Sequence, residues 1–453
     1  MDPADTNPCV VAKDTAGYCY THGRSHSQCE RERTESAEDV ESLTAPAESP
    51  VRRRGLFAGS FDPPTFGHLD AILRARSECD HLVVVVLRNE EKKSTFSSEE
   101  RVAMLRRMLR GAERVAMLRC LLHEANGITV LESDDLLVDV ILRENVQVIF
   151  RGIRDEKDRA YEERQLDYHR LILPPPRFPL VHFLPARDSL REVSSSLVKS
   201  FVNLDVDVSS MVPRFIKARL AMRLNGQLFL GVTGQMATGK SYVASRLVLD
   251  LCARGMTAHY VNLDELIRGL YAEHTPGAQA VRDELARVFG ERVLIANRGD
   301  VDRTVLKAAV SRADADVRRG LHELTAPHVE RLMRQAVRGK QGLVVVEWAQ
   351  LCETSMDYLV NGNAVVVESP DHQDFLAARG ATEFFEAMAR AQWSADRKVE
   401  YLQAASIRHG CGRVWRYVNR RGQGVDGLVS EIHAWAQERY LNMSTQRAAE
   451  DEL

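Results

Sequence analysis

The chain is 453 residues long, which exceeds the size of one usual hydrophobic core, so we expect two domains with extensions. Its 61 basic and 64 acidic side chains leave a formal net charge of −3, and this near balance excludes a surface that coats nucleic acid generally. No apolar run reaches the roughly 18 residues of a membrane-spanning helix, and the N-terminus lacks the basic and apolar regions of a signal peptide. We therefore expect a cytoplasmic protein whose partners are small molecules, not nucleic acid or membrane.

Residues 1–54 contain few large apolar side chains, so they cannot bury enough surface to offset the entropy lost on ordering. We predict a disordered extension. Within it, two cysteines and two histidines are spaced like the ligands of a short zinc knuckle: Cys19, His22, His26 and Cys29. These residues predict a structural Zn²⁺ site in a docking module that takes no part in catalysis. The alternative is a flexible tail in which the two cysteines and two histidines occur near one another by chance.

The stretch 55–68 changes from an apolar run to turn-forming residues and then to a helical pattern. This order predicts a strand, a tight turn and a helix that begins near His68. Gly59 and Gly67 carry no Cβ, so the backbone can approach a ligand there, and the start of the helix presents unpaired N–H groups to the turn. The stretch predicts a site for a nucleotide phosphate; an ordinary strand–helix turn with a capping histidine is the alternative.

Alternating strands and helices follow this turn. The apolar run His81–Leu87 has the length of a parallel strand covered on both faces, and another strand is expected at 148–150. Between them, Ser97 and Glu100 form a capping-box pattern that opens a helix. The alternation predicts an α/β fold with a doubly wound parallel sheet, whose ligands lie beyond the carboxyl ends of the strands. Three basic side chains would fall at that edge: His68, Lys92 and Arg151.

Several motifs of this first domain, residues 55–225, resemble in order and spacing those of the bacterial phosphopantetheine adenylyltransferases. They are Gly59–Pro63 with Thr65–His68, Lys92–Lys93, Arg151–Arg154 with Tyr161–Glu162, and Ser194–Lys199. The resemblance implies transfer of an adenylyl group from ATP to 4′-phosphopantetheine, with Mg²⁺ as cofactor. It also implies that the phosphates are held by Ser60, His68, Lys92 and Arg154. The adenosine and triphosphate side would be lined by Arg151, Glu162, Ser195 and Ser196, and Leu136 and Leu137 would lie beside the pantetheine arm. The expected site is completed by Gly59, Phe61, Gly152 and Ser194.

This reaction needs few reactive groups, because the 4′-phosphate that attacks the α-phosphorus is already an anion. The site must align the substrates and supply cations and N–H donors for charge on the oxygens, a role that Mg²⁺ shares. We therefore expect His68 and Lys92 to act as electrostatic clamps, without a covalent nucleophile. For any single basic residue, a solvated surface position is the alternative.

A second domain, residues 226–442, is expected to begin with a strand that leads into a full P-loop pattern and a helix. The P-loop consists of Gly234, Gln235, Met236, Ala237, Thr238, Gly239, Lys240 and Ser241. In such a loop the backbone N–H groups cradle phosphates, Lys240 reaches the β- and γ-phosphates, and the Ser241 hydroxyl ligates Mg²⁺. We predict a second ATP site on a second doubly wound parallel sheet, followed by a charged tail at 443–453.

Asp264 follows the next expected strand, and Arg268 lies one helical turn further on. This pair resembles the Asp-x-x-x-Arg motif of the dephospho-coenzyme A kinases, which implies that Asp264 accepts the proton of the ribose 3′-hydroxyl and Arg268 binds substrate. A helix N-cap is the alternative role of Asp264. The chain departs from the family pattern at four positions: Gln235 and Ala237 replace glycines, Asn262 replaces an aspartate, and Ala326 replaces a histidine.

The two resemblances together imply a bifunctional transferase that catalyses the last two steps of coenzyme A biosynthesis by way of dephospho-CoA. They also allow a homo-oligomer formed through the adenylyltransferase domain. One alternative is a nicotinamide mononucleotide adenylyltransferase joined to a ribosylnicotinamide kinase, which would carry a different motif in place of Val193–Lys199. The other is an adenylyltransferase whose kinase half binds nucleotide without turnover and acts as a scaffold.

Overall fold

The structure, a computed structural model, describes residues 53–87, 94–117, 127–270, 273, 275–295, 300–302, 305–306, 309, 315–372, 374 and 392–451. It divides into two compact units. The first comprises the residues up to Val198 together with Met211–Ile216, and the second comprises Lys199–Ser210 together with the residues from Lys217 onward. The expected zinc ligands Cys19, His22, His26 and Cys29, and also Lys92, lie outside the described residues.

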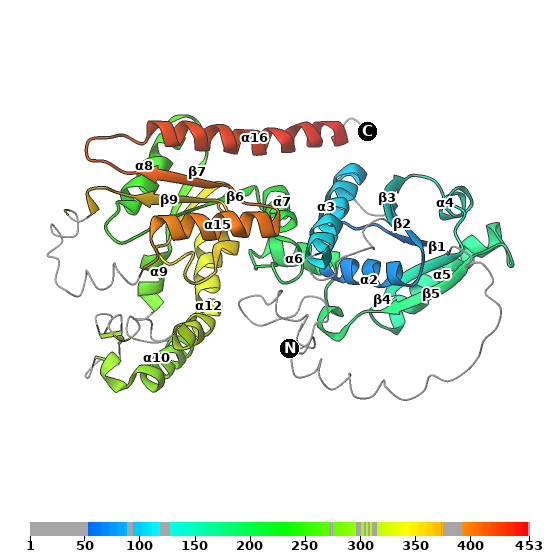
Figure 1. Ribbon diagram of the computed structural model, residues 1–453, viewed down its shortest axis with the longest axis horizontal. Coiled ribbons are helices and arrows are strands. Elements are labelled where there is room, and N and C mark those ends of the chain that lie inside the picture. The colour runs from blue at the N-terminus through cyan, green and yellow to red at the C-terminus, as the bar shows by residue number, and fades with distance from the viewer. Residues whose placement is uncertain are drawn as a thin grey trace, which may run out of the picture. The chain divides into compact units, whose positions relative to one another are not determined.

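The first unit is built on a five-stranded parallel sheet with the strand order β3-β2-β1-β4-β5 (Figure 1). Its strands are β1 (Arg54–Gly59), β2 (His81–Leu87), β3 (Ile128–Ser133), β4 (Val148–Ile153) and β5 (Leu180–Pro185). The helices that follow them are α2 (Phe66–Ser77), α3 (Ser98–Met117), α4 (Leu137–Arg143) and α5 (Glu156–Ile172), then the 3₁₀ turn η1 (Asp188–Leu190) and α6 (Ser195–Asn203), of which only the part up to Val198 belongs to the first unit. The predicted doubly wound sheet is confirmed, and its strand order reverses between β1 and β4, where such sheets bind ligands.

Both faces of this sheet are covered, which explains why its central strands are continuous apolar runs. On one face, alternate residues such as Leu56, Val83 and Ile149 pack against the apolar sides of α4 and α5. α2 contacts β1 and β2, and α3 contacts β2 and β3. The predicted capping box of α3 is formed: the Ser97 N–H donates to the Glu100 carboxylate (3.0 Å) and the Glu100 N–H to Ser97 Oγ (3.2 Å).

The second unit contains another five-stranded parallel sheet, in the order β10-β9-β6-β8-β7. Its strands are β6 (Gln227–Gly234), β7 (Ala258–Asn262), β8 (Gly342–Glu347), β9 (Ala364–Glu368) and β10 (Val414–Val418). Its helices are α7 (Arg214–Asn225, from Lys217 onward), α8 (Lys240–Ala253), α9 (Leu263–Leu270), α10 (Pro276–Phe289), α12 (Ala315–Val337), α15 (Ala395–His409) and α16 (Asp426–Asp451), with the short helices η2 (Glu291–Val293) and η3 (Asp357–Val360). The first strand, β6, is central, so the loop that follows it emerges where the strand order reverses.

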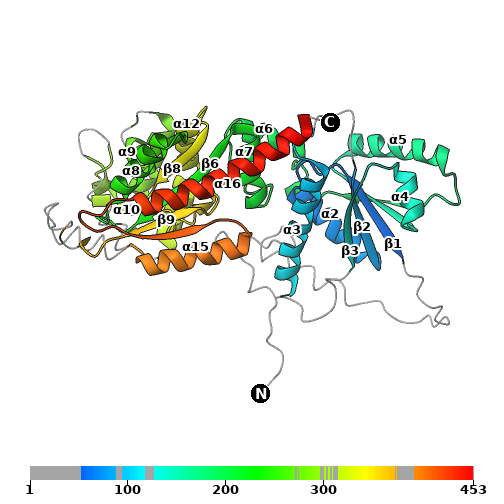
Figure 2. The ribbon, with the colours of Figure 1, turned by 90° about the horizontal axis from the view of Figure 1, so that it is seen from above.

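Helices cover this sheet on both faces as well. α8 and α16 lie side by side (Figure 2) and pack on one face, where they bury Leu247 and Ile432. α12 and α15 contribute Met333 and Leu402 to the core on the other face. Residues 443–451, expected as a charged tail, belong to α16.

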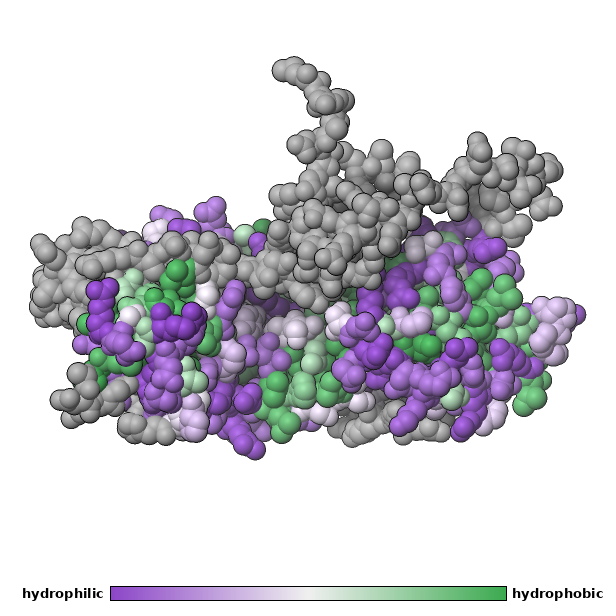
Figure 3. All heavy atoms as spheres, turned by 90° about the horizontal axis from the view of Figure 1, so that it is seen from below, coloured by the Kyte–Doolittle hydropathy of each residue, from purple (hydrophilic) through white to green (hydrophobic). Residues whose placement is uncertain are grey.

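None of the helices in the described ranges combines the length and the apolar character that crossing a bilayer would need. Figure 3 shows hydrophilic residues interspersed with smaller hydrophobic areas over the coloured part of one face. This mixture is ordinary for a protein surface, since apolar atoms make up much of it.

Candidate active sites

The turn after β1 holds Phe61 in an unusual conformation beside His68. Phe61 has a φ of 49°, in the left-handed region that costs a side-chain-bearing residue free energy, and its ring is 1% exposed. The ring meets the His68 imidazole edge-on, with 5.0 Å between the ring centroids. A Cβ on Gly59 would lie 3.1 Å from the Phe61 ring, so this glycine makes room for the ring that orients the histidine.

His68 belongs to the first turn of α2 and caps that helix. The Thr65 Oγ1 accepts from the His68 N–H (3.3 Å), and the His68 Nδ1 accepts from the Thr65 N–H (3.0 Å). Because Nδ1 accepts, the proton of the neutral ring resides on Nε2. The capping role and the anion-binding role are therefore compatible: one ring nitrogen caps the helix and the other is suited to donate to an anion.

Burial of the ring, and next the charge of Arg154, lower the pKa of His68 to about 4. We therefore expect His68 to be a neutral N–H donor at pH 7 in the unliganded protein, whereas the sequence suggested an electrostatic clamp.

An NMR titration should find the pKa of His68 more than one unit below 6.5, and Arg154→Gln should raise this pKa by removing the second cause. Because the folded-state pKa lies below that of an unfolded histidine, acidification from pH 6.5 to 4 should destabilise the fold. A pKa at or above 6.5 in the wild type would contradict this description.

The segment 94–101 is fastened to the same turn by two buried charged side chains. The Asp62 carboxylate accepts from the Thr95 N–H (2.9 Å) and from the Phe96 N–H (3.1 Å). Arg101, 2% exposed, donates through Nη1 to the Ser60 carbonyl (2.6 Å). Lys92 precedes this segment by a few residues, and its expected role stays a prediction.

Arg151 and Glu162 meet at the carboxyl half of β4. Arg151 donates through Nη1 to the Ala58 carbonyl (2.9 Å), and its Nε lies 3.4 Å from the Glu162 carboxylate. Arg154, just beyond β4, donates to the Asp158 carboxylate through Nε (2.6 Å) and Nη2 (2.8 Å). This pair is largely exposed and so contributes little stability, which lets Arg154 exchange the carboxylate for a phosphate at small cost.

The start of α6 lies against the turn. Ser195 Oγ donates to the Pro63 carbonyl (2.8 Å), and Ser194 Oγ caps the helix by accepting from the Leu197 N–H (3.2 Å). A Cβ on Gly67 would lie 3.6 Å from the Val193 carbonyl oxygen, so the starts of α2 and α6 are neighbours. Two helix N-termini at one turn favour an anion there.

The remaining expected residues of this unit lie at the same sheet edge but differ in exposure. Gly152 and Ser196 are exposed. Leu137, the first residue of α4, is 2% exposed and packs in the core, whereas Leu136 is 57% exposed. Of these two neighbouring leucines, only Leu136 therefore offers its side chain to the surface.

The P-loop of the second unit connects β6 to α8, and two of its own side chains hydrogen-bond to its backbone. Lys240 Nζ donates to the Gln235 carbonyl (2.8 Å), which also accepts from Thr238 Oγ1 (2.9 Å). Gly239 has a φ of 83°, and a Cβ there would lie 2.2 Å from the Asn419 amide nitrogen, which donates to the Thr238 carbonyl (3.0 Å). This position therefore requires glycine.

Two side chains from outside the loop form hydrogen bonds with the backbone of Met236. Its N–H donates to Gln392 Oε1 (2.6 Å), and its carbonyl accepts from His372 Nε2 (2.6 Å). An amide oxygen thus accepts from one of the N–H groups that a P-loop offers to phosphate. The next residue, Ala237, has a φ of 62°, which costs an L-residue roughly 1–2 kcal/mol and explains why the family pattern has glycine there.

Glu347, at the end of β8, collects three donors beside the P-loop serine. Its carboxylate accepts from Ser241 Oγ (2.7 Å), from the Tyr260 hydroxyl and from Asn262 Nδ2 (3.3 Å). Burial, followed by the bond to Glu347, raises the pKa of Tyr260, so this hydroxyl stays protonated. Our sequence reasoning missed Glu347, although its place directly after the apolar run 343–346 predicts a side chain at the carboxyl edge.

Asp264 lies in the first turn of α9, and Asn262 is the N-cap of this helix: its Oδ1 accepts from the Glu265 N–H (3.0 Å). The alternative interpretation of Asp264 as the cap is therefore wrong. Its carboxylate instead accepts from the Ala349 N–H (3.1 Å), two residues beyond Glu347. Arg268 is exposed in the last turn of the same helix.

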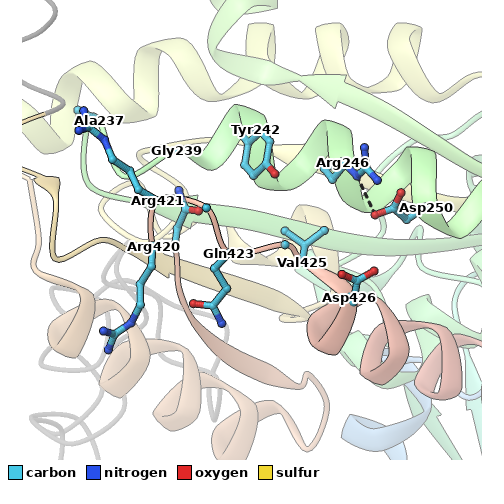
Figure 4. Close-up of a pocket in the computed structure, with 13 residues that line it drawn as sticks. Ala237, Gly239, Tyr242, Arg246, Asp250, Arg420, Arg421, Gln423, Val425 and Asp426 are labelled. Atoms are coloured by element: carbon cyan, nitrogen blue, oxygen red, sulfur yellow. Dashed lines mark hydrogen bonds and ion pairs between the residues drawn. The ribbon is translucent and has the colours of Figure 1, made fainter.

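A pocket of about 760 Å³ adjoins the P-loop, between the start of α8 and the loop from β10 to α16 (Figure 4). It is lined by Ala237 and Gly239, by Tyr242 and Arg246 of α8, and by residues 419–426. Arg421 extends toward Ala237, whereas Arg420 points away from it. Pattern reasoning did not identify this pocket, because a Gly- and Arg-containing loop after an edge strand reads as an ordinary connection.

Two family models match the chain: the model described as Cytidylyltransferase-like covers residues 56–201, and the model described as Dephospho-CoA kinase covers residues 228–404. The phosphopantetheine adenylyltransferase of Bradyrhizobium sp. is 32% identical over 175 residues, which are 39% of this chain and 100% of that protein. The phosphopantetheine adenylyltransferase of Petrotoga mobilis is 31% identical over 172 residues, which are 38% of this chain and 96% of that protein. The crystal structure of TT1252 from Thermus thermophilus is similar with 24% identity and a TM-score of 0.34, over 47% of this chain and 97% of that one.

Proposed function

The chain belongs to the phosphopantetheine adenylyltransferase family and contains a dephospho-CoA kinase domain at residues 228–404, and on this premise we propose that it catalyses the last two steps of coenzyme A biosynthesis. The observation that carries the proposal is the presence of one phosphate-binding turn in each unit, after β1 and after β6, where the strand order of each parallel sheet reverses. The adenylyltransferase domain would span 55–225 and the kinase domain 226–442.

In the first step, an oxygen of the 4′-phosphate attacks the α-phosphorus of ATP, and the bond from that phosphorus to the bridging oxygen breaks to release pyrophosphate. The Nε2–H of His68 donates to the oxygens that gain charge, with the N-termini of α2 and α6 beside it. Arg154 binds a phosphate, and Arg151 with Glu162 lines the adenosine side. Alignment and charge stabilisation account for the catalysis, because both reacting groups arrive activated.

In the second step, the ribose 3′-oxygen of dephospho-CoA attacks the γ-phosphorus, and the bond to the bridging oxygen breaks to release ADP. Asp264 accepts the proton of the attacking hydroxyl, Lys240 binds the β- and γ-phosphates, and Arg268 contacts the substrate. The pocket beside Ala237 and residues 419–426 is close enough to the loop to take the adenine of the same ATP.

Ser241 and Glu347 fit a magnesium ion, because a hydroxyl and a carboxylate are hard oxygen ligands and their oxygens lie 2.7 Å apart. When bound, Mg²⁺ would neutralise charge on the transferring phosphates. Asn262, which stands where the family has an aspartate, donates to Glu347 and adds no negative charge. Tyr260 and Asn262 therefore hold the single carboxylate of Glu347 in contact with the Ser241 hydroxyl.

We expect Glu347→Gln to raise the Mg²⁺ concentration needed for half-maximal phosphorylation by about 10–100-fold, because the site loses its charged oxygen ligand. Tyr260→Phe should cause a smaller rise, since it removes a donor and leaves the carboxylate. Both are measured by titrating Mg²⁺ in an assay of dephospho-CoA phosphorylation, with adenylyl transfer as the internal control. A magnesium dependence equal to that of the wild type in Glu347→Gln would refute this site.

The function itself is tested by incubating the protein with ATP, Mg²⁺ and 4′-phosphopantetheine and following the product masses. Dephospho-CoA should appear first and CoA later. Products made instead from nicotinamide mononucleotide would support the alternative pairing, and dephospho-CoA without CoA would support the scaffold interpretation.

We also propose that the enzyme works in the cytoplasm, where the free thiols of Cys79 and Cys352 stay reduced. Self-association through the first unit is supported by exposed apolar side chains on it, among them Leu136, Leu142, Leu171, Ile172 and Leu180. Analytical ultracentrifugation would test it. Zinc binding by the N-terminal extension stays a prediction, to be checked by metal analysis of the purified protein.

A further inference from the structure

The peptide groups of Ala349 connect Asp264 to a buried charge. The Ala349 N–H donates to the Asp264 carboxylate (3.1 Å), and the Ala349 carbonyl accepts from Lys398 Nζ (2.8 Å) and from Thr233 Oγ1 (3.2 Å). Thr233 is the last residue before the P-loop glycine Gly234. The catalytic carboxylate, the P-loop strand and α15 are therefore tied to one residue of the loop after β8.

Lys398 is an unusual residue for this position. Its side chain is fully buried on α15, and its ammonium donates to both oxygens of Glu353 (2.7 and 2.6 Å) besides the Ala349 carbonyl. Glu353 also accepts from the Trp393 N–H (3.0 Å). Lysine is almost never fully buried unless paired, and a buried ion pair is often no more stabilising than apolar residues of similar volume. Stability alone therefore gives little reason for a charge here.

We propose that Lys398 is a positioning residue for the phosphorylation step: by anchoring the Ala349 carbonyl, it orients the loop whose Ala349 N–H holds the Asp264 carboxylate. The inference rests on the proposed role of Asp264 as the proton acceptor. The Ala349 carbonyl and the Ala349 N–H belong to adjacent planar peptide units that meet at one Cα, so only the two dihedral angles of Ala349 separate them. Anchoring the carbonyl therefore limits how far this N–H can be displaced from Asp264. An ammonium in a low-dielectric core holds that carbonyl more firmly than a neutral donor can.

This role predicts a specific kinetic signature. A misdirected Asp264 carboxylate slows proton acceptance, whereas the phosphates of ATP are bound by the P-loop and Lys240. Lys398→Met should therefore lower kcat for dephospho-CoA phosphorylation by about 10²-fold, the usual cost of a misplaced catalytic group, while the KM for ATP changes little.

Because Lys398→Met leaves Glu353 buried without its cation, the test uses a second variant, Lys398→Met/Glu353→Gln, which removes both charges and keeps an acceptor for the Trp393 N–H. The matched control is Arg408→Met, which removes an exposed positive charge from the same helix and should leave kcat unchanged. Thermal unfolding reports on stability. The double variant should regain thermal stability relative to Lys398→Met and still show the lowered kcat.

A double-mutant cycle with Asp264→Asn separates this inference from the function on which it rests. If Lys398 acts through Asp264, then Lys398→Met/Glu353→Gln should cost no further activity in the Asp264→Asn background. Recovery of the wild-type kcat in the double variant, or full additivity with Asp264→Asn, would overturn the positioning role alone. An Asp264→Asn enzyme with wild-type kcat would instead overturn the assignment of Asp264.

Discussion

Lys240→Ala is expected to make dephospho-CoA accumulate, because the second step loses the ammonium that binds the β- and γ-phosphates. Removing one preorganised donor from charge that develops in a transition state costs about 10²–10³-fold in rate, so phosphorylation should fall by at least that factor. Lys240 is the first residue of α8 and is buried against the loop. Residues 234–241 contain no second lysine that could replace it. A time course of product masses measures the effect.

The first step of the same chain is the internal control for Lys240→Ala. Conversion of 4′-phosphopantetheine to dephospho-CoA should proceed at the wild-type rate, since the turn after β1 is built from another sheet. If the wild type itself stops at dephospho-CoA and Lys240→Ala matches it, the scaffold interpretation is correct and the kinase assignment fails.

His68→Ala should reduce formation of dephospho-CoA by about 10²–10³-fold, because the turn loses the Nε2–H donor that the capping box and Phe61 orient. The measurement is the initial rate of pyrophosphate release with ATP and 4′-phosphopantetheine. When dephospho-CoA is supplied directly, the variant should phosphorylate it at the wild-type rate.

The control for His68→Ala separates the chemical role of the ring from its structural one. Thr65→Val removes the hydroxyl that accepts the His68 N–H, at a cost of about 0.5–2 kcal/mol, and keeps the backbone N–H that holds Nδ1. Adenylyl transfer by Thr65→Val should stay within a few-fold of the wild type. A loss as large as that of His68→Ala would show that the helix start, and not the imidazole, carries the effect.

The central strands of both sheets could be predicted because both of their faces are buried. β2 and β8, for example, are almost continuous apolar runs of strand length. Of the four edge strands, β7 was predicted, whereas β3, β5 and β10 were not. β3 has two buried positions and β5 and β10 have one each, and their other positions are exposed or half-exposed, so their sequences resemble those of loops as much as those of strands.

Local motifs could be predicted for a related reason. The turn before His68, the capping box of α3 and the P-loop depend on residues within a few positions of one another, so the order of the amino acids nearly specifies their geometry. The family resemblance likewise rests on such short motifs. The fold class and the turns after β1 and β6 were therefore accessible before any coordinates.

The partners of the side chains proposed to be catalytic depend instead on how the sheets fold. Ser241 lies 106 residues from Glu347, Asp264 lies 85 residues from Ala349, and Lys398 lies 45 residues from Glu353. These pairs meet because parallel strands bring their carboxyl ends to a common edge of the sheet and because helices pack on the sheet at one register. A local sequence pattern does not encode which residues meet across such long separations in the chain. Amino-acid order thus specified the two turns for which we propose phosphate binding, and packing of the strands and helices decided which distant side chains lie beside them.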